Sequence, residues 1–501
     1  MREAARPFAT PCYTMFRDED AARTLLSRER TARDPGPSGG TPARARWLLA
    51  DRVSRALSEA ASSADPAERV VRLAVPVGSV EQLRWLRNQS LFPRLYWSGR
   101  VDGSGVAAVG AADLQESDTP EGPDELRKRL APLLASGDPQ ARYYGGLRFD
   151  PLREPDVEWA AFGAACLFVL PRFEVHTGKE EATLVCNLVL PRDVGRTAEI
   201  LEQIEHLSFQ QGSLDTALPA PISRTDAPGR EGWGRNIERA LVAFSEGRLD
   251  KVVLARRTEF VFAQEVDVAL LAESLKEVTP GCFHLYVEPE DGAAFVSASP
   301  ERLFRREGRV IESEAVAGTR PRGASEADDA ELREELLRSE KERSEHEHVR
   351  VDIAETLGPL CDELEVEERV SEMKLARRRH LISGVRGTLR EGVTDAEVLC
   401  ALHPTPAVSG YPREAALQEM RVLEPFDRGW YAGPVGWIGA GGAEFAVGIR
   451  SGLVRGNTLM LFSGAGIVAG SVPASEWAEI EQKVGDFTRM FGLDPERHAA
   501  R

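Results

Sequence analysis

Strand-like and helix-like segments follow one another irregularly along the whole chain, and this mixture is the feature that most constrains the fold. Strand-like runs such as RVVRLAVPV and ATLVCNLVL dominate residues 68–190, whereas amphipathic helical runs such as WGRNIERALVAFSEG appear after residue 230. The order shows no strict strand–helix–strand alternation, no internal repeat, and no glycine-rich nucleotide-binding motif after a first strand. We therefore expect an α+β or mixed layered fold, and neither a barrel nor a Rossmann domain.

The length of 501 residues predicts one large domain or two closely packed ones. Residues 1–45 are rich in Arg, Pro, Gly and Ser, which predicts a flexible N-terminal tail. We predict a strand-rich part at residues 46–225 that packs on a catalytic part at residues 230–490. The Pro/Gly/Ser-rich stretch 219–232 is interpreted as the linker between them.

The net charge of −17 argues against a nucleic-acid or anionic-membrane partner, although a locally basic site can still bind a small anion. The sequence contains no apolar run of about 18 residues, so we expect no transmembrane helix. The first 50 residues contain nine Arg and no apolar core, so we expect neither a secretory signal nor a transit peptide. Six scattered cysteines without a CxxC pair favour free thiols in a reducing cytoplasm over disulfides or zinc.

Two predicted helices carry acidic residues at helical spacing, and the first is a long charged helix expected to start near Ser325, a plausible N-cap. In SEKERSEHEHVR, Glu342 and Glu345 are three residues apart, and in SEWAEIEQK, Glu476, Glu479 and Lys483 share one face. Carboxylates on two helices can hold Mg²⁺, which uses one or two of them and keeps several waters. The alternative is a solvated face of charged residues.

Lys251 and Glu301 are the candidates for proton transfer. The chain has 56 Arg and only seven Lys, so a lysine hints at a position where a neutral amine is needed. Lys251 begins the apolar run KVVLAR, and Glu301 follows the buried run AAFVSASP. Burial lowers a lysine pKa and raises a glutamate pKa, which suits a general base and a general acid. The alternatives are a strand-end lysine with its ammonium in solvent and a turn-starting glutamate.

Several other stretches carry groups that can bind an anion. Gly464 and Gly466 in SGAGIV let backbone amides approach an oxyanion, or else form a simple turn. AGTRPRG at 317–323 is a second glycine- and arginine-containing corner, and Arg450 can hold a carboxylate through two hydrogen bonds. In LHPTPAVSGYPR, prolines restrict the backbone around His403, which we interpret as a positioning residue beside a pocket.

Nine motifs, in the order in which they occur along the chain, resemble those of the chorismate-utilising enzymes, and most closely the isochorismate synthases. The resemblance covers residues 230–487 through DKVVLARR, SASPERLF, EAVAGTRPRG, SEKERSEHEHVR, LHPTPAVSGYPR, FDRGWYAGPVGW, AVGIRS, SGAGIV and SEWAEIEQK. It implies the large layered fold of that family, with antiparallel or mixed sheets flanked by helices. It also implies Mg²⁺-dependent conversion of chorismate to isochorismate, for menaquinone or siderophore synthesis.

The resemblance assigns roles to the candidate residues. Lys251 matches the base that activates a water for attack at C2, and Glu301 matches the acid that protonates the departing C4 hydroxyl. Glu345 and Glu479 match the Mg²⁺ ligands, with Glu342 and Glu476 supporting them through water. The substrate-binding residues implied are Gly318, Thr319, Tyr431, Arg450, Gly464, Gly466 and Lys483, with His403 and Thr405 expected on the same pocket wall.

Two positions separate members of this family. Anthranilate synthases have Gln where Lys251 stands, and lysine-dependent aminodeoxychorismate synthases place their lysine where Ala317 stands. Both activities are therefore disfavoured, and with them a glutamine amidotransferase partner. The main alternative is a salicylate synthase, which would go on to eliminate pyruvate from isochorismate. For the oligomeric state, a monomer is the simplest expectation.

Two other classes of protein, a non-catalytic binding protein and a metal-dependent hydrolase, agree less well with the sequence. A non-catalytic binding protein on this scaffold would have lost the base, the acid or a metal ligand, and none is missing. A metal-dependent hydrolase would need a histidine-rich ligand set, but His346 and His348 are two residues apart and lie on different helix faces.

Overall fold

The structure is a computed structural model that describes residues 41–63, 65–100, 105–117, 123–177, 181–210 and 218–492. Most of the predicted N-terminal tail falls on residues 1–40, outside the described part. Residues 42–45 are not a tail, because helix α2 (Pro42–Ala61) already begins there. The Thr41 side chain caps α2 by accepting a hydrogen bond from the Arg44 amide, and the helix buries Leu49, Val53 and Leu57.

All strand pairs among the described residues are antiparallel, and they form one continuous network with two arms. The first arm runs in the order β1 (Arg69–Gly78), β6 (Ala182–Leu190), β5 (Cys166–His176), β3 (Gly105–Ser117), β2 (Arg94–Ser98), β9 (Phe283–Glu290), β10 (Ala293–Ser299), β19 (Ser451–Arg455), β20 (Thr458–Val468) and β8 (Lys251–Val261). The outer edge of β8 pairs with β16 (Gly410–Tyr411) and β7 (Ser223–Ala227).

The second arm starts from the same strand β5. It continues through β4 (Arg142–Leu147), β17 (Pro434–Gly439), β18 (Gly442–Val447), β11 (Arg302–Glu307), β12 (Val310–Pro321) and β15 (Arg378–Leu389), which pairs with β13 (Cys361–Val366) and β14 (Ser371–Lys374). Aromatic side chains pack against one another on the strands of this arm, among them Phe168, Phe304 and Phe445. The apolar runs of the sequence therefore become strands with a shared core.

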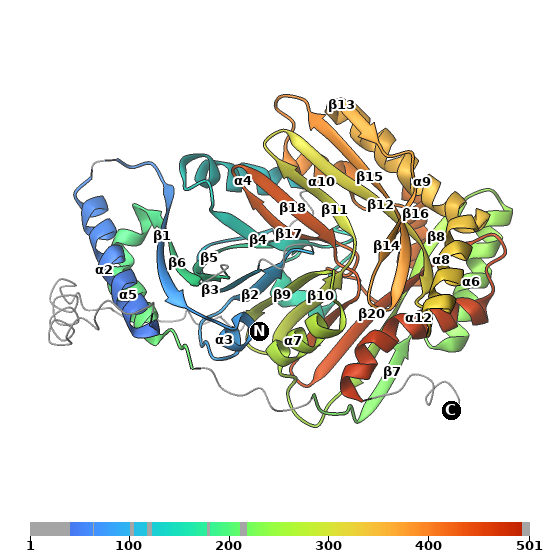
Figure 1. The fold of residues 1–501 in the computed structure, drawn as a ribbon, viewed down its shortest axis with the longest axis horizontal. Helices are drawn as coiled ribbons and strands as arrows, with labels where there is room; N and C mark the ends of the chain where they lie inside the picture. Colours follow the sequence, from blue (N-terminus) through green and yellow to red (C-terminus); the bar gives the residue numbers. More distant parts are fainter. Residues whose placement is uncertain are drawn as a thin grey trace, which may run out of the picture.

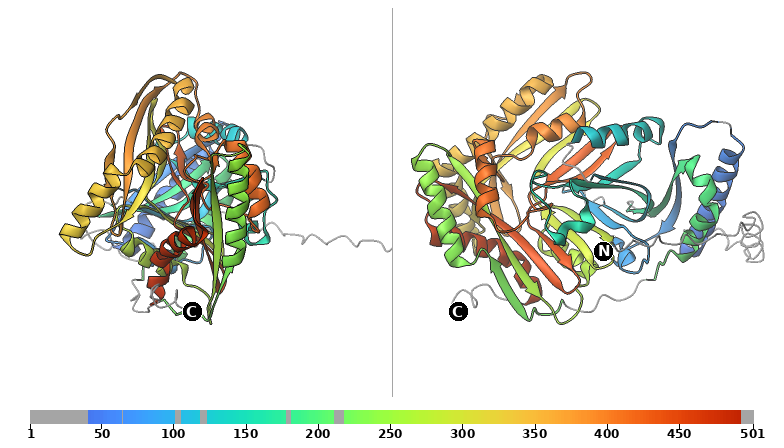
Figure 2. Two further views of the ribbon diagram at one scale, coloured as in Figure 1. Left: turned by 90° about the vertical axis from the view of Figure 1, so that its right-hand side faces the viewer. Right: turned by 180° about the vertical axis from the view of Figure 1, so that it is seen from behind.

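Helices cover the outside of the two arms (Figure 1). The remaining α-helices are α3 (Gln82–Arg87), α4 (Pro123–Ser136), α5 (Thr197–His206), α6 (Arg230–Ser245), α7 (Val268–Val278), α8 (Glu326–Arg338), α9 (Glu340–Leu357), α10 (Asp395–Leu402), α11 (Arg413–Leu423) and α12 (Pro473–Thr488). Short 3₁₀ helices span Val157–Phe162, Arg192–Arg196, Gly358–Leu360 and Arg489–Phe491. Helices α2 and α5 lie at one end of the molecule, and α6, α8, α9 and α12 lie at the other, as the view from behind also shows (Figure 2).

The expected α+β layered fold is confirmed, but the linker interpretation of 219–232 is wrong. Ser223–Ala227 forms strand β7, which pairs with Arg257–Val261 of β8, and α6 begins at Arg230. Ladder hydrogen bonds to β8 outweigh the turn-forming composition of this stretch. Strands from both predicted parts pair directly, β2 with β9 and β4 with β17, so the division into 46–225 and 230–490 stays a prediction.

The single charged helix expected from Ser325 is in fact two helices. Ser325 caps α8 as expected, but α8 ends at Arg338 and Ser339 caps a new helix, α9. The Ser339 hydroxyl accepts a hydrogen bond from the Glu342 amide at 3.4 Å. This second start sets the direction of α9, which carries Glu342 and Glu345.

The cysteines of the described residues, Cys166, Cys186, Cys282, Cys361 and Cys400, are not joined in disulfides, as predicted. Cys12 lies outside the described part. Among the helices that the structure describes, none is long and apolar enough to cross a membrane.

Candidate active site

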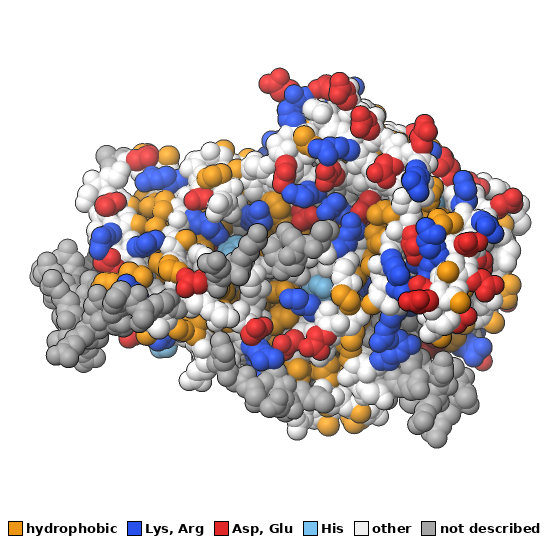
Figure 3. Space-filling view, viewed as in Figure 1, with side chains coloured by type: hydrophobic (Ala, Val, Ile, Leu, Met, Phe, Trp, Pro, Cys, Tyr) orange, Lys and Arg blue, Asp and Glu red, His pale blue; other side chains and the backbone are white. Residues whose placement is uncertain are grey.

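A large open cavity lies between α9, α12 and the strands β8, β12, β15 and β20. Its volume of about 2670 Å³ far exceeds the 300–1,000 Å³ typical of small-molecule pockets, so a small substrate would occupy only part of it. The space-filling view in Figure 3 shows acidic and basic side chains interspersed over the end of the molecule formed by α8, α9 and α12, on the right of the picture. The predicted residues on the cavity wall are Lys251, Glu301, Gly318, Thr319, Glu342, Glu345, Tyr431, Arg450, Gly464, Gly466, Glu476, Glu479 and Lys483.

Lys251 is the first residue of β8, where pairing with β20 and β16 fixes its backbone on both sides. Its side chain is mostly buried, and Nζ donates a hydrogen bond to Glu345 Oε1 at 2.8 Å. The predicted base and a predicted metal ligand are therefore direct partners in this structure.

Glu301 lies between β10 and β11 with its side chain buried at 7 % exposure. Burial, and secondarily the charge of Glu314, raises the pKa of Glu301 from 4.5 to about 8, while Lys251 acts in the opposite direction. Within the described residues, its carboxyl accepts and donates no hydrogen bond. Glu301 is thus a protonated carboxylic acid near neutral pH with its proton available to the cavity.

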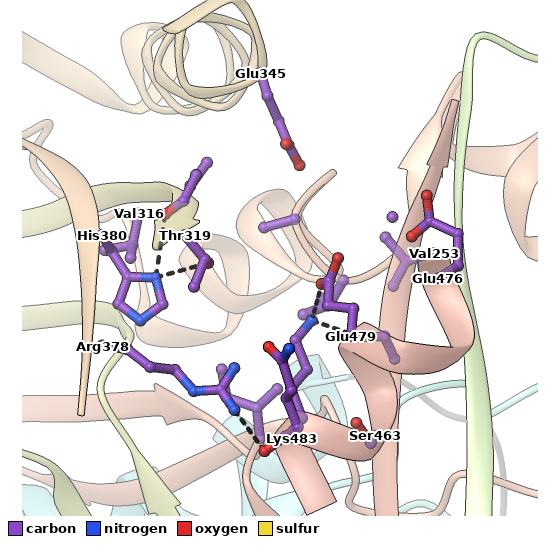
Figure 4. A pocket seen from close by; sticks show the side chains of 18 of the residues that line it. Val253, Val316, Thr319, Glu345, Arg378, His380, Ser463, Glu476, Glu479 and Lys483 are labelled. Carbon is purple, nitrogen blue, oxygen red and sulfur yellow. Dashed lines mark hydrogen bonds and ion pairs between the residues drawn. The ribbon is translucent and has the colours of Figure 1, made fainter. Parts of the chain in front are cut away.

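The two acid-bearing helices face each other across the cavity. Figure 4 shows Glu345 pointing inward from α9 and Glu479 pointing inward from α12. Glu342 Oε1 accepts a hydrogen bond from Arg320 at 2.6 Å, and its Oε2 accepts one from the Thr319 amide at 3.3 Å. Glu479 pairs with Lys483 Nζ at 2.7 Å. The solvated-face alternative is wrong for Glu342 and Glu476, because both side chains are buried.

No group of three or more His, Cys, Asp or Glu side chains within the described residues is close enough to chelate a metal by itself. Glu345 and Glu479 nevertheless suit Mg²⁺, a hard cation that needs only one or two carboxylates beside waters and substrate oxygens. The donor set is therefore compatible with an ion shared between protein and substrate.

Gly464 and Gly466 lie inside strand β20, so the alternative of a simple turn is wrong. Pairing of β20 with β19 ends at Phe462, which leaves this edge of β20 open from Gly464 onward. The Gly464 carbonyl accepts a hydrogen bond from Lys483 Nζ at 2.7 Å. Because N–H and C=O of one strand residue point the same way, the amides of Gly464 and Gly466 also face away from β8.

A side chain at Gly464 would collide with Tyr431, and one at Gly466 would be in tight contact with Lys251. A Cβ on Gly464 would lie 2.8 Å from Tyr431 Oη, and a Cβ on Gly466 would lie 3.3 Å from Lys251 Cε. Tyr431 stacks on Phe462, and burial raises the pKa of its hydroxyl to about 12, so the hydroxyl stays protonated. The open strand edge, Lys483 and Tyr431 together form a surface that donates hydrogen bonds to an anion.

Sequence reasoning missed His380, which lies on β15 between Arg450 and the 318–319 corner. His380 Nδ1 lies 3.2 Å from the Gly318 carbonyl oxygen and 3.0 Å from Thr319 Oγ1, and Nε2 lies 3.2 Å from Arg450 Nη2. Burial, reinforced by Arg450, lowers its pKa to about 3, so the ring is neutral and Nε2 accepts from the guanidinium. Nothing in the run LARRRHLISG signals this role, because only strand pairing brings the ring to the cavity.

His403 and Thr405 do not line the cavity, so their expected place on the pocket wall is wrong. His403 Nε2 donates to the Phe149 carbonyl at 3.0 Å, and the two rings meet edge to face at 5.6 Å. Burial lowers its pKa to about 4. Thr405 is buried too, and the residues of this stretch that reach the cavity are Pro406, Ala407, Val408 and Tyr411. Helix α10 ends at Leu402 and turns the His403 ring toward the core.

Comparison with known proteins decides the family. The chain matches the profile of the family described as "Chorismate binding enzyme" over residues 55–492. The chain belongs to the chorismate-binding enzymes. Among curated relatives, isochorismate synthase 2 of Arabidopsis thaliana is 34 % identical over 474 residues, with 88 % of this chain and 84 % of the relative covered.

Two further comparisons agree with this chorismate-binding enzyme assignment. The isochorismate synthase MenF of Haemophilus influenzae is 33 % identical over 426 residues, with 84 % of this chain and 92 % of the relative covered. The solved structure of the menaquinone-specific isochorismate synthase MenF from Escherichia coli superposes with a TM-score of 0.77 at 30 % identity, covering 89 % of this chain and 99 % of that one.

Proposed function

We propose that this chorismate-binding enzyme is an isochorismate synthase, an isomerase that converts chorismate to isochorismate. Water adds at C2 of the ring, the double bonds shift, and the C4 hydroxyl leaves as water, so the overall change is an isomerisation. The observation that carries the proposal is that Lys251 and a buried, protonated Glu301 line the same cavity. One can accept a proton and the other already holds one, as the reaction requires.

In this mechanism, the neutral amine of Lys251 removes a proton from water as it attacks C2. Glu301 donates its proton to the departing C4 hydroxyl. The pKa of about 8 keeps Glu301 protonated at neutral pH although it lies in a strongly acidic protein. This role requires Lys251 Nζ to leave its contact with Glu345 Oε1 at 2.8 Å and turn toward the water.

The two carboxylates of chorismate suit the donors around the cavity. The amides of Gly464 and Gly466 and the ammonium of Lys483 would hold the ring carboxylate, and Tyr431 and Arg450 would hold the enolpyruvyl carboxylate. Gly318 and Thr319 would line the pocket between them, with His380 orienting the corner. Mg²⁺ at Glu345 and Glu479, with Glu342 and Glu476 behind them, would neutralise the ring carboxylate.

Salicylate formation is the second candidate, because a synthase that also eliminates pyruvate would need the same base. The curated relatives are named isochorismate synthases, which favours a reaction that ends at isochorismate without pyruvate elimination. Residue identity argues against the two amine-forming reactions, because Lys251 is not Gln and Ala317 is not Lys. We propose that the enzyme acts as a cytoplasmic monomer without an amidotransferase subunit, serving menaquinone or siderophore synthesis.

The test is product analysis. The purified chain is incubated with chorismate, with and without Mg²⁺, and the products are separated by chromatography. We expect isochorismate in equilibrium with chorismate, formed only when Mg²⁺ is present. Salicylate with pyruvate as the end product would replace the proposal by the salicylate synthase alternative, and no turnover would refute both.

A further inference from the structure

Strand β8, which carries Lys251, has a gap along its outer edge. Strand β16 pairs with Lys251 and Val252, and β7 pairs with residues 257–261, so along this outer edge no strand of the described chain pairs with residues 253–256. Two of these residues, Val253 and Ala255, point their backbone groups outward. Unpaired backbone groups in a buried strand are costly, so something else must satisfy them.

A buried ion pair fills this gap. Ala255 N donates to Glu424 Oε1 at 2.8 Å, and Arg428 Nη2 donates to the Val253 carbonyl at 2.7 Å. The two side chains also bind each other, with Arg428 Nε 2.9 Å from Glu424 Oε2 and Nη2 2.5 Å from Oε1. A carboxylate and a guanidinium, together with the Ser409 carbonyl that accepts from Val253 N at 2.7 Å, thus take the place of a neighbouring strand.

The same pair also contacts the loop at Val408 and the turn at Tyr431. Arg428 Nη1 donates to the Val408 carbonyl at 2.9 Å, and the Arg428 carbonyl accepts from the Tyr431 amide at 2.9 Å. The Arg428 guanidinium also lies over the Tyr431 ring, 5.5 Å from its centroid. One ion pair therefore links the strand of Lys251, the loop at Val408 and the turn of Tyr431.

Stability alone does not explain this pair. Both side chains are 3 % exposed, and desolvation of such a pair commonly cancels its Coulomb attraction. Its side-chain bonds reach the β8 backbone two residues from Lys251, and they also reach the Val408 carbonyl. Arg428 itself begins the turn that contains Tyr431. Fixing geometry is the role that remains.

We propose that Glu424 and Arg428 are positioning residues, which hold Lys251 and Tyr431 at the distance that catalysis requires. The inference rests on the proposed function for its kinetic consequence. A displacement of about 1 Å at a reacting group can cost about 100-fold in rate. Loosening β8 should therefore lower kcat more than it weakens chorismate binding, because Arg450 and Lys483 also hold the substrate and do not depend on this pair.

The test compares Glu424→Gln with a matched control, Asp193→Asn. Asp193 is also a fully buried carboxylate that binds an arginine, Arg172, at 2.6 Å and a strand amide, Val189 N, at 2.7 Å. It lies in the strand-rich N-terminal part, and it does not line the cavity. For each variant, kcat, KM for chorismate and the thermal midpoint are measured.

We expect Glu424→Gln to lower kcat by about 10- to 100-fold with KM changed less than about 3-fold. Asp193→Asn should lower the thermal midpoint with kcat within about 2-fold of the wild type. Equal losses of kcat in both variants, or an unchanged kcat in folded Glu424→Gln, would refute the positioning role. If Glu424→Gln does not fold, Arg428→Lys retains the charge but not the forked hydrogen bonds, and it should show the same loss.

A second readout does not depend on turnover. Hydrogen exchange of the peptide covering residues 251–257 should accelerate in Glu424→Gln and remain unchanged in Asp193→Asn. An inactive wild type would refute the proposed function, and exchange would then decide the positioning role separately. Unchanged exchange in residues 251–257 would contradict the structural basis of the inference.

Discussion

Replacement of Glu301 by Gln should make the folded protein more stable toward alkaline pH while it abolishes isochorismate formation. In the wild type, folding transfers this carboxyl into a buried site where the charged form is disfavoured, and its pKa rises from 4.5 to about 8. A glutamine side chain has nearly the same shape and does not titrate. The pH-dependent part of the stability difference therefore reports on Glu301 alone.

The sign follows from proton binding in the two states. Between pH 4.5 and pH 8, the folded state binds the proton and the unfolded state releases it, so the free energy of unfolding falls as pH rises. One pKa unit corresponds to about 1.4 kcal/mol, which gives an upper bound of about 5 kcal/mol for the whole shift. Most of it, about 3 kcal/mol, should be lost between pH 5 and pH 8.

Urea unfolding at pH 5, 6, 7 and 8 measures the effect, with the exposed Glu391→Gln as the control. The advantage of Glu301→Gln over the wild type should grow by about 3 kcal/mol across this range, and that of Glu391→Gln should stay constant. The wild-type rate should correspondingly fall as pH rises through about 8, where Glu301 loses its proton. A stability difference independent of pH would refute the buried, protonated state of Glu301.

Four other predictions concern groups on the cavity wall. Lys251→Ala should lower kcat by at least about 100-fold while chorismate binding, followed by titration calorimetry, persists; normal turnover would contradict its role as base. Glu345→Ala and Glu479→Ala should each remove activity together with its Mg²⁺ dependence, and an active, metal-independent variant would disprove the ion site. Gly464→Ala should lower activity by about 10-fold or more, because its Cβ would lie 2.8 Å from Tyr431 Oη. Full activity of Gly464→Ala would contradict the steric explanation.

The family motifs made the core of the site predictable, because short local patterns carry the reacting groups. Lys251 at the start of a strand, Glu301 after a strand and the acids spaced by three on helices all have local signatures. The structure brings these residues to one cavity. The capping residue Ser325 was predictable for the same reason, since a cap depends on the next turn only.

Other features depend on distant segments and had no local signal. His380 reaches the cavity only because β15 pairs with β12 next to Gly318. His403 has the rigid surroundings of a site residue, yet its partner is the carbonyl of Phe149, far away in the sequence. The stretch at Ser223–Ala227 resembles a linker and becomes a strand because the edge of β8 is available to it.

The sequence by itself determined the α+β class, the chemical groups and the order in which they occur, because residue type and short-range spacing decide these. Only the tertiary structure decided which groups meet and in what state. The pKa of Glu301 rises because segments from different parts of the chain exclude water around it. The Glu424–Arg428 pair holds β8 because the gap between β16 and β7 leaves the Ala255 amide and the Val253 carbonyl to side chains that are distant in sequence. Burial and long-range pairing are properties of the packed chain, so no local pattern specifies them.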